Sequence, residues 1–123
     1  MGNWLAVAAG GAIGASLRYG VFVLFARPGS STVPWHTLGV NVVGSFLLGL
    51  LMAALPGTHS AERWQLFAGV GILGGFTTFS TFSVETVSLV HQGAPAAAAA
   101  YAALSLAGAL AGAWAGYAIG RAL

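Results

Sequence analysis

The sequence predicts an all-α membrane protein in which four transmembrane helices form a single domain over residues 1–123. Of its 123 residues, 58% are hydrophobic and only 5% are charged, whereas soluble globular proteins carry about 25% charged residues. Four stretches are long and apolar enough to cross a bilayer, which takes about 20 residues for one helix. A soluble fold would have to cover its surface with apolar side chains, so lipid is the expected surrounding.

The four predicted spans are joined by short connections. They cover approximately residues 3–26, 36–55, 62–90 and 95–122. Pro56-Gly57 is a turn sequence that ends the second span, and Pro95 opens the fourth span in its first turn, where a missing N–H costs little. Trp4, Trp35 and Trp64 fall near the ends of spans, as is typical of the aromatic belts at membrane surfaces.

The third span is the longest, and the sequence predicts a break near its middle. The pair Gly74-Gly75 weakens a helix, and five hydroxyl residues follow it: Thr77, Thr78, Ser80, Thr81 and Ser83. A hydroxyl group on a membrane helix often only bonds back to a carbonyl group one turn earlier. Five of them beside a glycine pair indicate instead a broken helix whose freed backbone groups line a cavity or bind an ion.

Phenylalanine recurs every three residues in the same stretch, at Phe76, Phe79 and Phe82. These rings could simply pack or face lipid. An aromatic ring also has a positive edge, and ring edges together with the hydroxyl groups of Ser80, Thr81 and Ser83 can hold an anion without a cationic side chain that would trap it. Weak binding of this kind suits a conducting site.

Glycines also recur at intervals of four residues. The positions are Gly10 and Gly14, Gly71 and Gly75, and Gly108, Gly112, Gly116 and Gly120. Small residues at this spacing let membrane helices approach closely. The spacing predicts tight helix packing and leaves open whether the partner helix belongs to the same chain.

The arginines give no preferred orientation in the membrane. With four spans, Arg63 and Arg121 lie on one side, and Arg27 lies on the other with Arg18 if its side chain reaches that surface. Two positive charges on each side leave the positive-inside rule without a preference. We therefore expect both orientations and an antiparallel, dual-topology homodimer.

Several function classes are excluded by what the sequence lacks. Cysteine is absent, and the two carboxylates, Glu62 and Glu85, are 23 positions apart, so no catalytic set is available and no enzyme is expected. Four scattered arginines make no basic patch for nucleic acid. The spacing Gly69-x-Gly71-x-x-Gly74 matches a dinucleotide fingerprint, but no strand or βαβ unit surrounds it.

Four further polar residues inside spans are candidates for a functional role. Asn41 is an amide deep in the second span, so it either bridges helices or faces a pore, because a buried amide without partners is costly; Thr37 lies one turn earlier on the same face. Glu85 could mark a vestibule, pair with an arginine or lie near an interface. Arg18 either reaches the membrane surface or draws anions to a pore mouth. The three histidines fall near helix ends, and a surface location is expected.

Three segments together resemble the Fluc family of bacterial fluoride ion channels (CrcB-type). They are GGFTTFSTFSVE at residues 74–85, GVNVVGSF at 39–46 and GASLRY at 14–19, and the similarity covers essentially the whole chain. It implies passive, fluoride-specific efflux across the bacterial inner membrane, which lowers cytoplasmic fluoride. It also implies an antiparallel homodimer with two pores along the subunit interface.

The resemblance also implies roles for individual residues. It assigns the fluoride pore to Thr37, Asn41, Phe79, Phe82, Tyr101 and Ser105. A sodium ion on the two-fold axis would be held by the backbone carbonyls of Gly74 and Thr77 from both subunits. Arg18 matches an arginine of the family's first span. Ala109 stands where some members carry serine, so the hydroxyl track on the fourth span is shorter here.

Two other functions compete with a fluoride channel. Small multidrug-resistance-type transporters are also short, four-span and dual-topology, but they need a carboxylate in the first span, where this chain has Arg18. A non-transporting membrane assembly subunit would account for the glycine spacing.

Overall fold

The computed structural model describes residues 2–25, 32–55 and 59–123. All regular secondary structure in these ranges is helical, which confirms the predicted all-α class. The elements are, in order, α1 (Gly2–Phe25), α2 (Trp35–Ala54), α3 (His59–Trp64), η1 (Gln65–Leu73), α4 (Gly74–Phe76), α5 (Phe79–His91) and α6 (Pro95–Gly120). The predicted connection around Arg27 and the Pro56-Gly57 turn lie outside the described residues.

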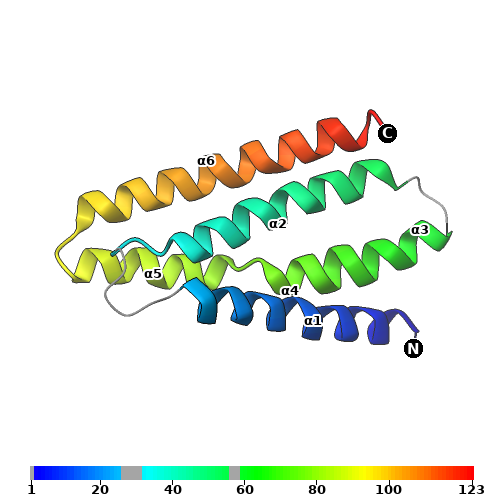
Figure 1. Cartoon of the computed structure of the whole chain (residues 1–123), viewed down its shortest axis with the longest axis horizontal. Helices are drawn as coiled ribbons and strands as arrows, with labels where there is room; N and C mark the ends of the chain where they lie inside the picture. Colours follow the sequence, from blue (N-terminus) through cyan, green and yellow to red (C-terminus); the bar gives the residue numbers. More distant parts are fainter. Residues whose placement is uncertain (1, 26–31, 56–58) are drawn as a thin grey trace.

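Within the described residues, four helical stretches are long and apolar enough to cross a membrane, as predicted: Gly2–Phe25, Trp35–Ala54, Ala61–His91 and Pro95–Gly120. Figure 1 shows them lengthwise beside one another, with both chain ends at the same end of the bundle. α2 packs mainly against α6, and α1 packs mainly against η1 and α4. Large apolar side chains such as Leu17, Val43 and Leu104 face outward on these helices, as expected for a protein surrounded by lipid.

Glycines bring each pair of helices into backbone contact. A methyl group added at Gly10 or Gly14 would collide with backbone atoms of η1, and one added at Gly116 would collide with the carbonyl oxygen of Phe46 on α2. These collisions explain why no larger residue stands there. The glycine spacing therefore serves packing within one chain, which the sequence leaves open.

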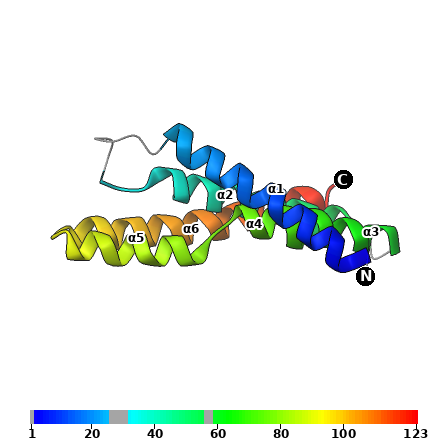
Figure 2. The same cartoon turned by 90° about the horizontal axis from the view of Figure 1, so that it is seen from below.

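The third membrane-spanning stretch changes its helical form before it breaks. η1 is a π-helix, which the sequence does not predict, and one turn of α-helix, α4, follows it. Thr77 (φ −77°, ψ 156°) and Thr78 (φ −152°, ψ 116°) are extended, and α5 begins at the next residue. Figure 2 shows this extended link between α4 and α5. The predicted break is thus confirmed.

The break does not fall at the glycine pair from which it is predicted. Gly74 and Gly75 both belong to α4 and keep helical geometry. A methyl group at Gly75 would press on the carbonyl oxygen of Gly11 in α1, so this glycine serves close packing. The extended residues Thr77 and Thr78 are held by a contact from α2, described next.

Candidate functional site at the helix break

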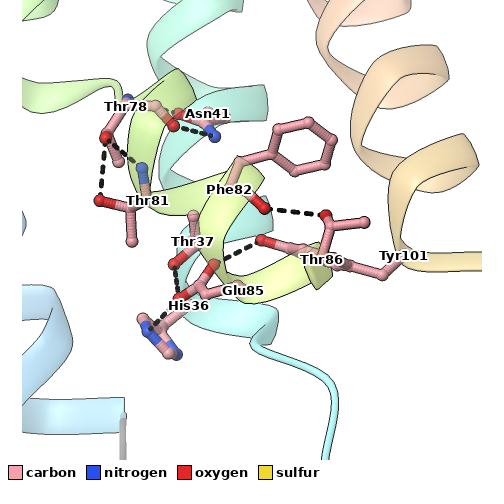
Figure 3. A network of polar contacts seen from close by, with 9 residues as sticks. All are labelled: His36, Thr37, Asn41, Thr78, Thr81, Phe82, Glu85, Thr86 and Tyr101. Atoms are coloured by element: carbon pink, nitrogen blue, oxygen red, sulfur yellow. Dashed lines mark hydrogen bonds and ion pairs between the residues drawn. The ribbon is translucent and has the colours of Figure 1, made fainter. Parts of the chain in front are cut away.

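Asn41 of α2 holds the broken helix open. Its side-chain Nδ2 donates a hydrogen bond to the carbonyl oxygen of Thr78 (3.0 Å), and the Thr78 N–H donates one to its Oδ1 (2.8 Å). Figure 3 shows the amide facing the extended backbone. Asn41 is therefore a bridge between helices, one of the two alternatives that the sequence allows. It also lines a cavity, as shown below, so the two alternatives do not exclude each other.

Thr78 then starts the next helix. Its hydroxyl oxygen accepts a hydrogen bond from the Thr81 N–H (3.2 Å) and donates to the Thr81 hydroxyl (2.9 Å), so it caps α5 as threonine commonly does. The exposed Ser80 hydroxyl lies 3.4 Å away from that of Thr78. Ser83 donates back to the carbonyl oxygen of Phe79 (2.9 Å). The Thr77 hydroxyl likewise donates to the carbonyl oxygen of Leu73 (3.0 Å). Of the five predicted hydroxyls, Thr77 and Ser83 thus bond back to a carbonyl group one turn earlier.

Three aromatic rings form a row beside the break. The ring centroids of Phe79 and Phe82 are 5.5 Å apart, and those of Phe82 and Tyr101 are 5.4 Å apart. Phe82 packs on the buried cluster of Leu89 and Tyr101, whereas Phe79 is 78% exposed. Phe76 lies on the other side of the break and is not part of this row, because the extended residues interrupt the helical period.

A cavity of about 220 Å³ opens between the break, α2, α5 and α6, and we call it the break cavity. It is lined by Asn41, Ser45, Thr77, Thr78, Phe79, Phe82, Ser105, Leu106 and Ala109. The lining combines amide, hydroxyl and aromatic groups, and the described residues contribute no charged side chain to it. It therefore brings together four residues with predicted pore roles, namely Asn41, Phe79, Phe82 and Ser105.

One hydroxyl group in the break cavity lacks a partner within the described part of the chain. Ser105 is only 5% exposed, yet its Oγ makes no hydrogen bond there. A buried polar group without a partner costs free energy, so this hydroxyl is free to bond to a water or an ion that enters the cavity. Ala109, one turn later on α6, adds only a methyl group to the lining.

Ser45 also lines the break cavity, although no role is predicted for it from the sequence. It lies four residues after Asn41 on α2, one helical turn further along the same face. That spacing was the available signal, because residues four apart on a helix share a face. As a second polar residue on the face of Asn41, Ser45 was predictable from the sequence as part of the same site.

A second cavity, of about 210 Å³, lies on the α1 side of α5, and we call it the vestibule cavity. It is lined by Arg18, Phe22, His36, Thr37, Val40, Thr78, Thr81 and Glu85. Thr78 borders both cavities. In contrast to the break cavity, this one carries charged side chains, so both predicted vestibule residues, Arg18 and Glu85, lie together in it.

Both carboxylate oxygens of Glu85 accept hydrogen bonds from hydroxyl groups. Thr37 donates to Oε1 (2.8 Å), and Tyr101 donates to Oε2 (2.7 Å), as Figure 3 shows. Thr37 is 3% exposed and Tyr101 is fully buried. These two predicted pore residues therefore position Glu85 next to the vestibule cavity, and their hydroxyl hydrogens do not point into the break cavity.

Arg18 reaches back to the broken helix. Its Nε donates a hydrogen bond to the carbonyl oxygen of Gly75 (3.2 Å), and its side chain is half-buried against the vestibule cavity. It therefore satisfies one carbonyl group near the end of α4. Of the two alternatives for Arg18, this arrangement favours a positive charge at the cavity.

The predicted surface location is wrong for His36. Its side chain is only 16% exposed, and its Nε2 lies 3.6 Å from Oε1 of Glu85. The ring of Phe22 meets it edge to face, with centroids 5.5 Å apart. His36 is largely shielded because Phe22 of α1 and Glu85 of α5 pack against it, and the sequence around His36 does not reveal these neighbours. His91 is exposed, as predicted, and the side chain of His59 lies outside the described residues.

The break frees carbonyl oxygens that could face a cation. The Thr78 N–H, which a continuous helix would direct to the carbonyl of Gly74, bonds to Asn41 instead. The Thr81 N–H, which would serve Thr77, bonds to the Thr78 hydroxyl. Among the described residues, no three His, Cys, Asp or Glu side chains gather as metal ligands, so a cation here would depend on oxygens of this kind.

Known proteins and a family model match this sequence over nearly the whole chain. The family model for CrcB-like proteins (Camphor Resistance) matches residues 5–117. A relative from Agrobacterium fabrum is 47% identical over 97% of this chain and 96% of its own length. Another from Thermus thermophilus is 48% identical over 100% of this chain and 98% of its own. A third, from Caulobacter vibrioides, is 45% identical over 98% and 97%.

All three relatives carry the name "Fluoride-specific ion channel FluC", which denotes an ion channel and not an enzyme. With its four apolar helices, the chain is a multi-pass membrane protein. It belongs to the CrcB family.

Proposed function

We propose that this protein is a fluoride-specific ion channel that lets F⁻ leave the bacterial cell passively across its inner membrane. The observation that carries the proposal is the break cavity, where the unpaired hydroxyl of Ser105 lies with the Asn41 amide and the Phe82 ring. The names of the relatives supply the identity of the ion. The whole chain, residues 1–123, would act as one four-helix transmembrane domain.

The chemistry of the break cavity suits a small, strongly hydrated anion. Fluoride must exchange its water for close hydrogen-bond donors. The side-chain nitrogen of Asn41 carries two hydrogens, and Thr78 accepts one of them, so the other can serve an anion. Ser105 offers its hydroxyl, and the edges of Phe79 and Phe82 add weak positive potential. A lysine or arginine in direct contact with the anion inside the break cavity would hold it too tightly for conduction.

The site residues divide into two groups in this proposal. The break cavity holds Asn41, Phe79, Phe82 and Ser105, which would contact the dehydrated anion. The vestibule cavity holds Arg18, Thr37, Thr81 and Glu85, with Tyr101 behind Glu85, and would pass the anion from water. Ser80 and Ser83, in the first turns of α5, would line the path of the anion along this helix.

We further propose that two copies assemble as an antiparallel homodimer. Several observations support a second copy: Phe79 is 78% exposed and Trp114 is 77% exposed, and a third cavity of about 800 Å³ lies open between α2 and α6. The balanced arginines support insertion in both orientations. Labelling of single cysteines at both chain ends from each side of sealed vesicles tests this, since one orientation alone would reject it.

A sodium ion at the two-fold axis of such a dimer is the cofactor that we propose. The carbonyl oxygens of Gly74 and Thr77 fit this role, because the N–H groups that would serve them in a continuous helix bond elsewhere. Bound there, sodium would supply positive charge between converging carbonyl dipoles. The sodium ion would thereby link the helix break of one subunit to that of the other.

Fluoride efflux from liposomes tests the channel function. Purified protein is reconstituted into vesicles loaded with potassium fluoride, and valinomycin starts the efflux, which a fluoride electrode follows. We expect fluoride efflux and no comparable chloride efflux. Absence of fluoride efflux would favour the assembly subunit, and proton-coupled export of organic cations would favour the small multidrug-resistance-type transporter.

A further inference from the structure

We propose that His36 sets the net charge of the vestibule cavity through its contact with Glu85, so that anion conduction increases as the pH falls. This inference depends on the proposed channel function and goes beyond it. His36 acts as a positioning residue, because it touches the carboxylate and not the anion in the break cavity. Neither the resemblance nor the predicted site includes it.

The imidazole ring is held in place from two sides. Its Nε2 lies 3.6 Å from Oε1 of Glu85, the same oxygen that accepts the Thr37 hydroxyl at 2.8 Å. Phe22 of α1 contacts the ring edge to face. The exposed fractions are 16% for the His36 side chain and 21% for that of Glu85. Both groups are therefore largely shielded from water. Charges in such partly buried positions are screened much less than charges in solvent.

Every helix around the vestibule cavity contributes one ionisable or charged group. α1 contributes Arg18, α2 contributes His36 and α5 contributes Glu85; Tyr101 of α6 bonds to the far oxygen of Glu85. With a neutral imidazole, the charges of Arg18 and Glu85 sum to +1 − 1 = 0. With a protonated imidazole, the sum becomes +1.

This change of charge acts directly on anions. Imidazole is the side chain that ordinarily changes charge between about pH 5 and pH 8. A unit charge about 6 Å from an anion changes its occupancy about threefold even with the dielectric screening of water, and more when it is closer or partly buried. Protonated His36 also offsets the repulsion that Glu85 exerts on an approaching anion. Anion access should therefore be greater in acid.

Faster conduction in acid coincides with the condition in which a cell takes up most fluoride. Fluoride crosses membranes as neutral HF mainly when the medium is acidic, and it ionises again inside the cell. A channel whose vestibule becomes more positive in acid conducts best under the condition in which fluoride accumulates.

The test is fluoride efflux from liposomes at about pH 8 and about pH 5.5, with the same pH on both sides and the leak of protein-free vesicles subtracted. For the wild type we expect efflux about threefold faster, or more, at the lower pH. His36→Gln keeps a hydrogen-bond donor without a titrating charge and should show the slower rate at both pH values. His36→Arg carries a permanent charge and should show the faster rate at both.

The outcomes separate this inference from the proposed function. No fluoride efflux from the wild type at either pH would reject the channel function, and the inference would fall with it. Fluoride efflux with equal rates at both pH values would overturn only the inference. So would a His36→Gln variant that keeps the wild-type ratio, since another group would then be responsible. If His36→Gln does not fold, His36→Asn and His36→Arg give the same comparison.

Discussion

The side-chain amide of Asn41 and the backbone of Thr78 exchange two hydrogen bonds, of 3.0 Å and 2.8 Å, across the break in the third membrane-spanning stretch. The two residues are 37 positions apart in the chain. A broken helix in lipid must satisfy its backbone groups locally, and here a neighbouring helix does so. Because Asn41 also borders the break cavity, the residue that holds the break open is the one that can donate to an anion.

Replacement of Asn41 by alanine should therefore impair both stability and conduction. The Thr78 N–H would lose its acceptor, and an unsatisfied buried donor costs about 1–3 kcal/mol. We expect a lower unfolding midpoint in detergent and loss of fluoride efflux. Asn3→Ala is the matched control, because Asn3 is exposed on α1 and lies outside both cavities. Wild-type efflux from Asn41→Ala would show that the amide serves only the fold.

The two phenylalanines of the ring row should respond differently to isoleucine. Phe82 touches both Phe79 and Tyr101, so Phe82→Ile should reduce stability by about 1–2 kcal/mol. Phe79 is 78% exposed, and Phe79→Ile should leave the stability of the subunit nearly unchanged. Both should reduce fluoride efflux roughly tenfold or more, because isoleucine has no positive ring edge.

Phe25→Ile serves as the control for these two variants, since Phe25 is exposed at the end of α1. Its efflux should equal that of the wild type. Efflux that is unchanged in Phe79→Ile and Phe82→Ile would remove ring edges from the proposed site and leave the amide and hydroxyl donors alone.

The sequence was sufficient to predict the class of this fold, but not the cause of the break. Low charge and four long apolar stretches predict membrane helices whatever the packing. The exact place of the break depends on Asn41, a contact from another helix, and so Thr77 and Thr78 are extended while Gly74 and Gly75 remain helical. The low helix propensity of glycine predicted a break at Gly74-Gly75, but the hydrogen bonds from Asn41 place the break at Thr77 and Thr78.

Only part of the site could be predicted from the sequence, because some of its residues are defined by contacts with other helices. The motif at residues 74–85 and the amide of Asn41 were visible as polar groups in apolar sequence. His36 and Ser45 were not, because their roles depend on which helices face them: Glu85 for His36, and the break cavity for Ser45. The π-helix η1 packs against Gly10 and Gly14 of α1. No local sequence pattern predicts that residues 65–73 form a π-helix.

Ser45 should supply the hydroxyl that α6 lacks at Ala109. Both residues line the break cavity with Ser105. A hydrogen bond to a charged group contributes about 1.5–3 kcal/mol, so Ser45→Ala should slow fluoride efflux about tenfold. Ala109→Ser places a hydroxyl on the same cavity from the opposite helix and should restore much of the rate in the Ser45→Ala background.

Ser16→Ala provides the comparison for Ser45→Ala. Ser16 is exposed and bonds back to the carbonyl oxygen of Ala12 (2.7 Å), and its loss should not change efflux. Wild-type efflux from Ser45→Ala, or a double variant as slow as Ser45→Ala alone, would exclude Ser45 from the anion path.

Two neighbouring glycines of α1 should show opposite responses to alanine. A methyl group at Gly14 would collide with the carbonyl group of Ile72 and with the backbone nitrogen of Phe76, whereas one at Gly11 meets no atom within 4 Å. Overpacking of this kind costs about 1–3 kcal/mol or more, while alanine favours a helix over glycine by about 1 kcal/mol. Gly14→Ala should therefore lower the unfolding midpoint in detergent, and Gly11→Ala should leave it equal or raise it. Because α4 leads into the break, Gly14→Ala should also slow fluoride efflux. Equal midpoints for the two variants would mean that α1 does not pack on η1 and α4 through backbone contact.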